Sequence, residues 1–563
     1  MRIKPLFHFA LSISLLATSA AANAGGLAGA YLSANHANSK NDYAAAAEYY
    51  SKALMQDPDD AFILQNALLT HVISGDMDVS VKLAKDIAEL NIGSQLSDLI
   101  IIASLSKQQD FDQALDLLEQ SKDRISTLLY GLMKGWILAG SGDMTATTAH
   151  FDTMRTPSAL LLFGQYHKAL ATAMTGDFNQ ANIYMKGEGR DALHLNRGSL
   201  IAHVQILSQL SKFDEAADIL AQNLTSSADQ QLQYLHDKMV AKEVVPFDFI
   251  RSATDGLSES FLTLANVLSG EEDERFTLIY ARIAEFLRKD NIQPLLLLSE
   301  MLKGQEQYDL ATQVLAKVPA SHPLYLNAAI GRSDTLLDAG KPEAAIAILQ
   351  RLIHSHPQVA RVHMVLGDVY TSEKEFRKAS KAYSVALDIL EKDGKAQWFL
   401  YYARAVAFER MGDWDKAETD FRTALRLSPN QPSTLNYLGY SLVEKRIKLD
   451  EAQELIERAV QGRPNDGFIT DSLGWLLYRV GKFEEAVAPM ERAVELLPTD
   501  PVINDHLGDV YWKVGRQREA RFQWSRAMSF EPEEKDAARI RRKLDVGLDE
   551  VLKSEEADIP NAN

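Results

Sequence analysis

Small and apolar residues recur along this chain at intervals of 34 residues, most clearly towards the C-terminus. Each unit is predicted to be two antiparallel helices joined by a short turn such as Gly412-Asp413 or Gly481-Lys482. A proline closes the unit because it cannot continue a helix. The residues that carry the period are Leu438-Gly439, Leu473-Gly474 and Leu507-Gly508; Ala452, Ala486 and Ala520; and Pro464, Pro498 and Pro532.

The regular spacing has a steric explanation. A small residue on the first helix and an alanine on the second are expected where the two helices cross, since only minimal side chains allow such close approach. Large residues such as Tyr383, Phe421 and Trp524 fill the gap towards the next unit. The pattern resembles the tetratricopeptide repeat (TPR) family. The resemblance implies an all-α fold, a right-handed superhelical solenoid of about fourteen TPR-type helix-turn-helix repeats.

The register breaks once, because Val204 and Ala265 are 61 residues apart, about 27 more than one repeat. The extra residues predict a helix from Gln230 to Glu243. The predicted organisation is therefore a signal peptide over 1–24, a degenerate N-terminal array over 25–227, an interrupting helical segment over 228–258, a C-terminal array over 259–532, a capping helix over 533–553 and a disordered tail over 554–563.

The first 24 residues are typical of an export signal. Two positive charges precede an apolar run from Leu6 to Ala22, and Ala22-Asn23-Ala24 supplies the small residues of a cleavage site. We expect cleavage before Gly25 and a bacterial periplasmic protein, peripheral at the envelope at most; a retained N-terminal anchor is the alternative. With no cysteine in the sequence, a lipid anchor on cysteine is not expected.

Composition and motifs argue against catalysis. The net charge of −18 disfavours nucleic-acid and anionic-lipid binding. The sequence contains neither a phosphate-binding loop nor a zinc-protease or serine-hydrolase motif. We therefore predict a protein that is not an enzyme and that needs no cofactor or metal. Its partners are expected to be other proteins or extended peptides.

The first helices of such repeats line the concave face, so binding residues are expected next to the small position. Aromatic, acidic and amide residues there suit an extended peptide. The prediction names Tyr402, Asn436, Tyr440, Asp471, Trp475, Tyr478, Asp505, Asp509 and Trp512. Trp475 and Trp512 have packing between repeats as an equal alternative. A basic docking patch for an acidic partner is considered at Arg539, Arg541, Arg542 and Lys543, against the alternative of a solvated face of the capping helix.

The span from Leu435 to Leu552 resembles a narrower group. The motifs that carry this resemblance include Asp471-Ser-Leu-Gly-Trp-Leu-Leu-Tyr-Arg-Val-Gly and Glu519-Ala-Arg-Phe-Gln-Trp. This is similar to bacterial envelope TPR adaptors that bind periplasmic carboxyl-terminal processing proteases and deliver substrates to them. The resemblance implies such a protease as partner. Those adaptors are typically lipoproteins, unlike this cysteine-free chain, so a scaffold for polysaccharide export or outer-membrane biogenesis is the alternative.

Overall fold

A computed structural model of the chain describes residues 26–154, 159–187, 196–224, 230–270, 274–392 and 394–557, and these are helical with short connections. The contacts divide the chain into two compact units, unit 1 (Met1–Ile348) and unit 2 (Leu349–Asn563). The helices that begin in unit 1 are α1 (Leu27–Ser39), α2 (Tyr43–Leu54), α3 (Ala61–Ser74), α4 (Met77–Glu89), α5 (Gln95–Lys107), α6 (Phe111–Gln120), α7 (Thr127–Gly140), α8 (Met144–Thr153), α9 (Ala159–Met174), α10 (Phe178–Lys186), α11 (Arg197–Gln209), α12 (Phe213–Asn223), α13 (Gln230–Val240), α14 (Ala253–Leu268), α15 (Arg275–Leu287), α16 (Gln293–Gly304), α17 (Tyr308–Ala316), α18 (Tyr325–Asp338) and α19 (Pro342–Ser355), with a 3-10 turn at Lys122–Arg124.

Unit 2 continues with regular helix pairs and ends in two further helices. Its helices are α20 (Ala360–Ser372), α21 (Phe376–Lys392), α22 (Trp398–Arg410), α23 (Trp414–Leu427), α24 (Pro432–Lys445), α25 (Leu449–Gly462), α26 (Gly467–Arg479), α27 (Phe483–Leu496), α28 (Pro501–Lys513), α29 (Gln517–Ser529), α30 (Glu534–Val546) and α31 (Leu548–Ala557). Apart from α13, α30 and α31, the described helices form fourteen consecutive pairs, which confirms the predicted all-α repeat architecture. None of the described helices is both long and apolar enough to cross a bilayer.

Aspartate caps start the second helices of the first five repeats. The side chains of Asp42, Asp76, Asp110, Asp143 and Asp177 each accept a hydrogen bond from the backbone N–H three residues later. Such a cap satisfies a free N–H of the first turn and its charge favours the helix N-terminus. The residue before the cap has a positive φ, often as glycine. The turn chemistry of this sequence therefore fixes where each second helix begins.

Glycines allow the two helices of a repeat to touch, but they face the large residues Tyr383 and Trp524 of the second helix, which the sequence pattern places towards the next unit. A Cβ added to Gly508 would lie 2.4 Å from the Trp524 ring, and one added to Gly367 would lie 2.4 Å from the Tyr383 ring. Gly135 stands in the same relation to Phe151, at 2.3 Å. In all three pairs the large residue follows the glycine by sixteen positions. A side chain at the glycine would force the helices apart.

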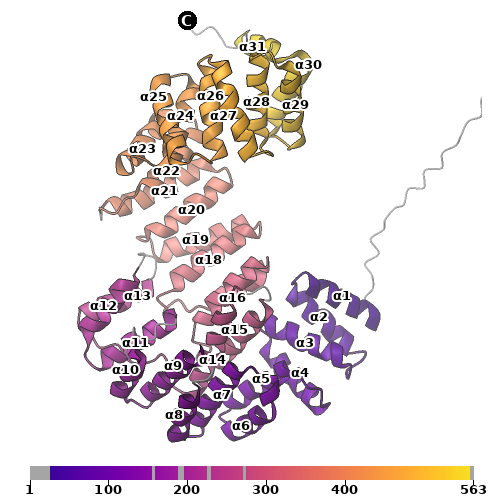
Figure 1. Cartoon of the computed structure of the whole chain (residues 1–563), viewed down its shortest axis with the longest axis vertical. Helices are drawn as coiled ribbons and strands as arrows, with labels where there is room; N and C mark the ends of the chain where they lie inside the picture. Colours follow the sequence, from indigo (N-terminus) through magenta and orange to yellow (C-terminus); the bar gives the residue numbers. More distant parts are fainter. Residues whose placement is uncertain are drawn as a thin grey trace, which may run out of the picture. The chain divides into compact units, whose positions relative to one another are not determined.

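The pair α14–α15 does not stack on the preceding helix pair as the other pairs do, because it packs inside unit 1. Helices α1 to α13 follow an arc, and α14 and α15 lie within it (Figure 1). Helix α14 packs on α7 and α9, and α15 packs on α3 and α5. Every residue of α14 from Ala253 to Ala265 is buried. The sequence-based expectation that residues from 259 onward belong to a separate C-terminal array is therefore wrong for this hairpin.

Close steric and polar contacts hold the inserted hairpin. A Cβ on Gly256 would lie 2.1 Å from the Trp136 ring, so only glycine fits where α14 passes α7. The Arg282 Nε of α15 donates to the Ile73 carbonyl of α3 at 2.9 Å, and Arg282 is buried. Thr254 Oγ1 donates to the carbonyl of Ser106 in α5 at 3.1 Å. These bonds satisfy polar groups that burial leaves without water.

A buried carboxyl group also joins α14 to α9. The Tyr166 hydroxyl donates to Glu259 Oε1 at 2.9 Å, and both side chains are buried. Burial disfavours the charged carboxylate and raises the pKa of Glu259 to about 7, although the Tyr166 hydrogen bond opposes the rise. Beside them Trp136 Nε1 donates to His167 Nδ1 at 2.8 Å, and burial lowers the pKa of His167 to about 3.

Two further details differ from the predicted domain organisation. The unpaired helix near 230 ends at Val240, and an extended segment with short turns leads to α14. The predicted capping helix over 533–553 is two helices, because Gly547 has φ +84° between α30 and α31. Helix α31 runs to Ala557, so residues 554–557 of the predicted tail are helical. Residues 558–563 and the predicted signal peptide lie outside the described residues.

Candidate functional site

The residues predicted to line the concave face of unit 2 lie on the first helices α22, α24, α26 and α28, and exposure divides them into two groups. One group is partly exposed: Tyr402, Asn436, Tyr440 and Trp512. The other group is buried: Asp471, Trp475, Tyr478, Asp505 and Asp509. The buried group contacts its own chain, so it has little surface to offer a partner.

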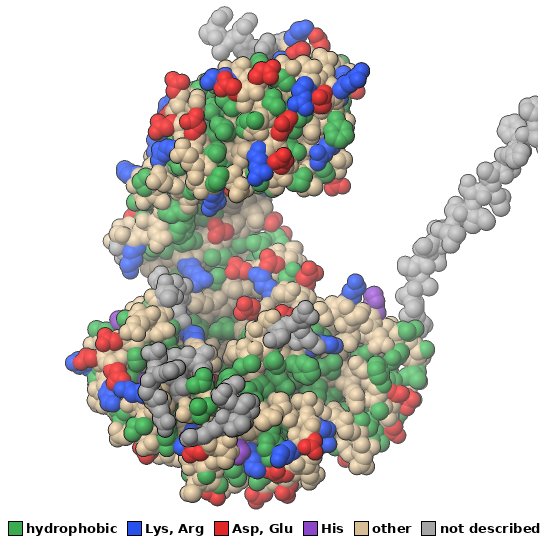
Figure 2. All heavy atoms as spheres, in the orientation of Figure 1, with side chains coloured by type: hydrophobic (Ala, Val, Ile, Leu, Met, Phe, Trp, Pro, Cys, Tyr) green, Lys and Arg blue, Asp and Glu red, His purple; other side chains and the backbone are tan. Residues whose placement is uncertain are grey.

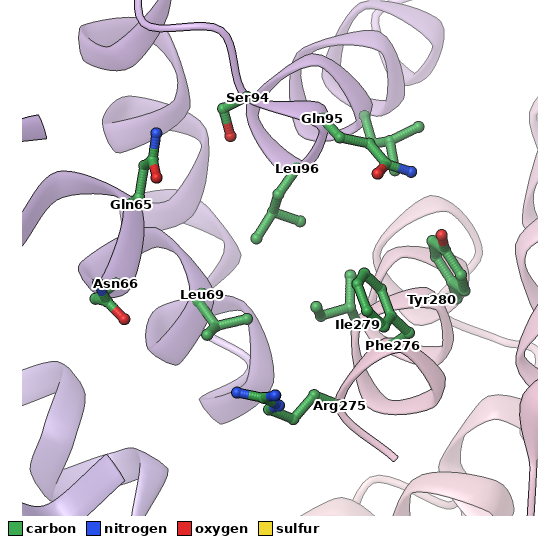
Figure 3. Close-up of a pocket in the computed structure, with 11 residues that line it drawn as sticks. Gln65, Asn66, Leu69, Ser94, Gln95, Leu96, Arg275, Phe276, Ile279 and Tyr280 are labelled. Carbon is green, nitrogen blue, oxygen red and sulfur yellow. The ribbon is translucent and has the colours of Figure 1, made fainter. Parts of the chain in front are cut away.

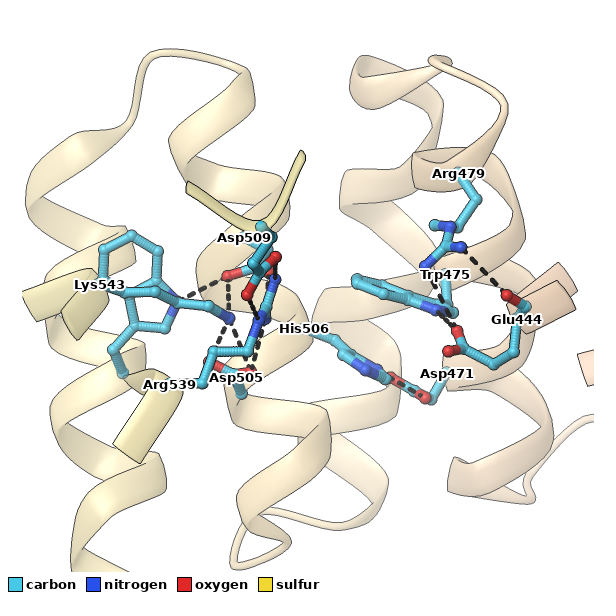
Figure 4. Close-up of polar contacts among 11 residues, drawn as sticks. Glu444, Asp471, Trp475, Arg479, Asp505, His506, Asp509, Arg539 and Lys543 are labelled. Atoms are coloured by element: carbon cyan, nitrogen blue, oxygen red, sulfur yellow. Dashed lines mark hydrogen bonds and ion pairs between the residues drawn. The ribbon is translucent and has the colours of Figure 1, made fainter. Parts of the chain in front are cut away.

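Aromatic rings of α26 and α28 stack on one another, and Figure 4 labels two of them, Trp475 and His506. The ring of Trp475 lies parallel to those of Tyr478 and His506, with centroids 4.7 Å and 3.9 Å away. Trp475 Nε1 donates to Glu444 Oε1 at 2.5 Å, and His506 Nδ1 lies 3.0 Å from Asp471 Oδ1. Burial by itself disfavours imidazolium, but Asp471 and nearby carboxylates outweigh it and raise the pKa of His506. This stack joins neighbouring repeats.

The acidic residues of α28 are neutralised by α30. Lys543 Nζ lies 2.8 Å from both oxygens of Asp505 and 2.6 Å from Asp509 Oδ1, and its side chain is fully buried. Arg539 adds an ion pair of 3.5 Å with Asp509 (Figure 4). Burial and the charge of Asp509 raise the pKa of Asp505, while Lys543 opposes the rise. The aspartates therefore bind the capping helix α30 to the last repeat.

Of the four basic residues considered for a docking patch, Lys543 is buried, Arg539 is partly buried, and Arg541 and Arg542 are exposed; the docking role stays a prediction. Besides Lys543, Arg539 is tied to α31 through Glu555 at 2.8 Å. Arg541 is exposed and pairs with Glu534 at 3.0 Å, and Arg542 is exposed and donates to the Ser554 hydroxyl. A run of basic residues in the sequence does not form one surface, because a helix of 3.6 residues per turn distributes neighbouring residues over all its faces. Charges of both signs are dispersed over the face of unit 2 seen in Figure 2.

The tryptophan of α28 likewise contacts the cap. Trp512 Nε1 donates to Asp549 Oδ2 of α31 at 2.9 Å, and a Cβ on Gly547 would lie 2.7 Å from its ring. Its ring also lies 5.4 Å from that of Trp524. For Trp512, as for Trp475, the structure therefore supplies the packing role that the sequence left as an alternative.

The inner face of α22 and α24 is more open. Tyr402, Asn436 and Tyr440 are partly exposed there, and the ring of Tyr402 lies 5.9 Å from that of Tyr437 and 6.4 Å from that of Trp398. Sequence reasoning missed Trp398, although its position one helical turn before Tyr402 was a usable signal. These aromatic rings give a partner rigid, amphipathic contact area.

Asn436 stands out within this open face. Its Oδ1 is shielded from solvent and accepts no hydrogen bond from any residue that the structure describes. A shielded, unpaired carbonyl costs about 1–3 kcal/mol relative to a paired one. Tyr440 follows Asn436 by one helical turn on α24, so the two side chains lie on the same face of this helix. Among the described residues, no group of three or more histidine, aspartate or glutamate side chains is placed to hold a metal ion.

Comparison with protein families agrees with this architecture. Models of the tetratricopeptide repeat match residues 330–394 and 398–431. These two stretches are tetratricopeptide repeats by their match to the family. Tetratricopeptide repeats stack so that each repeat contacts its neighbours, as the helix pairs of this chain do.

Two curated relatives cover parts of the chain. A TPR repeat-containing protein of Pseudomonas aeruginosa is 30% identical over 159 residues, which are 28% of this chain and 26% of that protein. Protein O-mannosyl-transferase TMTC1 of Homo sapiens is 25% identical over 170 residues, or 30% of this chain and 19% of that protein. The chain therefore spans only 26% of the length of the first relative and 19% of the second.

Among solved structures, the APC/C hetero-tetramer Cut9–Hcn1 is similar over 80% of this chain and 96% of its own, with 15% identity and a TM-score of 0.37.

Proposed function

We propose that this chain is a protein-binding scaffold that holds an extended segment of a partner protein on the inner face of α22 and α24. The observation that carries the proposal is the set of partly exposed aromatic and amide side chains, Tyr402, Asn436 and Tyr440, on the first helices α22 and α24. An extended peptide offers backbone N–H groups that are unpaired within its own strand. Binding would cover the rings of Tyr402 and Tyr440 and give the Asn436 side-chain amide a backbone partner.

Peptides selected from a random library on the immobilised full-length chain test this proposal. Asn436→Ala and Tyr402→Ala should each weaken a selected peptide by about tenfold, since each removes roughly 1.4 kcal/mol of contact. Asn223→Ala is the matched control, because Asn223 is exposed on α12 and, among the described residues, donates to the Ile219 carbonyl of its own helix. Equal affinities for Asn436→Ala and the wild-type chain would place the binding surface elsewhere.

The cellular role that we propose is delivery of substrates to a periplasmic carboxyl-terminal processing protease. Support comes from the resemblance of the span Leu435–Leu552 to the adaptors of such proteases, and from the export signal pattern of residues 1–24. Capture of partners from a periplasmic fraction tests the role. Recovery of a processing protease, lost with Asn436→Ala, supports it. Recovery of polysaccharide-export or outer-membrane assembly proteins alone would favour the envelope-assembly scaffold instead.

The proposed location has its own test. N-terminal sequencing of the chain recovered from the periplasmic fraction should begin at Gly25 if the signal is cleaved. A chain that begins at Met1 and sediments with membranes would indicate a retained anchor.

A further inference from the structure

Insertion of the α14–α15 hairpin leaves two cavities in unit 1. In the first, α15 faces α3 and α5 across a volume of 380 Å³, which Leu69, Phe276 and Ile279 line with apolar surface (Figure 3). In the second, residues of α14 and α16 enclose 240 Å³ together with residues at the start of α11. Of the two, the second cavity has a buried carboxyl group in its lining.

That carboxyl group belongs to Glu259 of α14, which is 3% exposed. The Tyr166 hydroxyl of α9 donates to its Oε1 at 2.9 Å, and among the described residues this is the one hydrogen bond that the side chain makes. A carboxylate can accept about four hydrogen bonds. The positive charge of Arg288 acts on Glu259 from a distance, because its guanidinium donates to the carbonyls of Asp248 and Phe249. The Glu259 Oε2 atom is therefore available to a donor in the cavity.

The charges around this cavity favour a cation. Glu300 of α16 adds a second, exposed carboxylate to the lining. Arg197 of α11 is the one cationic side chain among the described residues that line it, and its Nη2 donates to Gln231 Oε1 of α13 at 2.9 Å. Burial by itself disfavours the Glu259 carboxylate, and a cation beside it would offset that cost.

The rest of the lining suits an alkyl chain. Leu262 of α14 is buried, Leu296 and Leu297 of α16 are half-buried, and Phe249 adds an aromatic ring. An aromatic ring attracts an ammonium group as well as methylene groups. These walls disfavour a hydrated metal ion, which needs oxygen ligands in their place. A volume below the roughly 300–1,000 Å³ of typical ligand pockets leaves room for a group of few atoms.

We propose that this cavity binds a primary ammonium group on a short alkyl chain. The ammonium donates to Glu259 and Glu300, and its methylene groups lie between Leu262, Leu296 and Leu297. A free alkylamine and a lysine side chain of a partner protein share this chemistry. The site lies in unit 1 and uses no residue of the α22–α24 face, so its failure and the failure of the proposed peptide-binding face are separate results.

Saturation-transfer NMR with the full-length chain at pH 8 tests the proposal. At this pH Glu259, whose pKa is raised to about 7, is ionised, while an alkylamine, like lysine with a pKa of about 10.4, stays protonated. The probes are n-pentylamine and 1-pentanol, which match in shape and differ in charge. Pentylammonium should bind about tenfold more tightly than pentanol, the size expected for one charge-assisted contact. Equal affinities, or no saturation transfer to either probe, overturn the proposal.

A blocked peptide distinguishes the two sources of the ammonium group. Acetyl-Gly-Ser-Lys-Ser-Gly-amide should displace pentylamine if the cavity accepts a lysine side chain of a partner protein. Pentylamine binding that the peptide does not displace would assign the site to free amines. Either result supports an ammonium site.

Substitutions in the cavity test which side chains hold the ammonium group. Glu259→Gln should remove the preference for pentylammonium, and Glu300→Gln should reduce it about threefold. Glu89→Gln is the matched control, because Glu89 is exposed on α4 and does not line the cavity. Leu297→Ala should weaken both probes alike, because it removes apolar contact only.

Glu300 is exposed, so its substitution leaves the core intact, and circular dichroism checks the folding of every variant. An undiminished preference for pentylammonium in both glutamate variants would overturn the proposal.

Discussion

Replacing Gly256 by alanine should weaken the packing of α14 against α7 in unit 1. The new Cβ would lie 2.1 Å from two atoms of the Trp136 ring, about 1 Å inside normal contact distance. Trp136 cannot retreat freely, because its Nε1 bonds to His167 and its ring meets Phe151 edge-on at a centroid distance of 6.1 Å. Overpacking of this kind costs about 3 kcal/mol at its upper end. The better helix propensity of alanine offsets about 1 kcal/mol, which leaves a net loss of about 2 kcal/mol.

Hydrogen exchange measured by mass spectrometry on peptides from α14 is the suitable assay, because a chain of two units need not unfold in one step. Opening of α14 should become about thirtyfold more frequent in Gly256→Ala, corresponding to roughly 2 kcal/mol. Gly304→Ala is the matched control: Gly304 is also helical, and nothing lies within 4 Å of its added Cβ. The control should be neutral or slightly stabilising. Equal protection of α14 in both variants would refute the tight insertion of α14 against α7.

Two other substitutions follow from buried charges. Because the folded-state pKa of Glu259 is raised to about 7, the folded state holds its proton more tightly than the unfolded chain, and stability falls as pH rises from about 4.5 to 7. Glu259→Gln should abolish this pH-dependent loss of unfolding free energy, which is up to about 3 kcal/mol. The variant should therefore show a smaller drop in Tm between pH 5 and pH 8 than the wild-type chain. An unchanged drop would contradict the raised pKa of Glu259. Lys543→Met leaves Asp505 and Asp509 without their ammonium partner and should lower the free energy of unfolding by about 3 kcal/mol, measured by thermal unfolding. Lys535→Met, on the exposed side of α30, is the control and should have almost no effect. Similar Tm values for the two variants would show that the buried pair contributes little.

The chain's own sequence determines the repeat, because the contacts within a repeat are local. Gly508 and Trp524 touch at a fixed spacing of sixteen, and Asp76 caps a helix that begins one residue later. Both relations link residues of neighbouring helices or turns, so they recur with the 34-residue period and are visible without coordinates. The all-α class, the pairing of helices and the break near residue 230 follow from this periodicity.

For the predicted site residues, the period predicts the helix face on which each lies but not whether that face is exposed. The period places Tyr402, Asn436 and Asp505 alike on the inner side of first helices, since it reports which face of a helix a residue occupies. It does not report what covers that face. Asp505 is buried because Lys543, 38 positions away on the cap, lies against it, while Tyr402 and Asn436 keep part of their surface exposed.

Tertiary structure alone decided where α14 and α15 lie. Their sequence fits another helix pair in the ladder, but the contacts that hold them, such as Gly256 with Trp136 and Thr254 with Ser106, join residues more than a hundred positions apart. Such contacts occur once and leave no period in the sequence. The choice between extending an array and folding into it depends on the shape of the concave surface, which exists only after the first repeats have packed. The cavity beside Phe276 is a consequence of that choice.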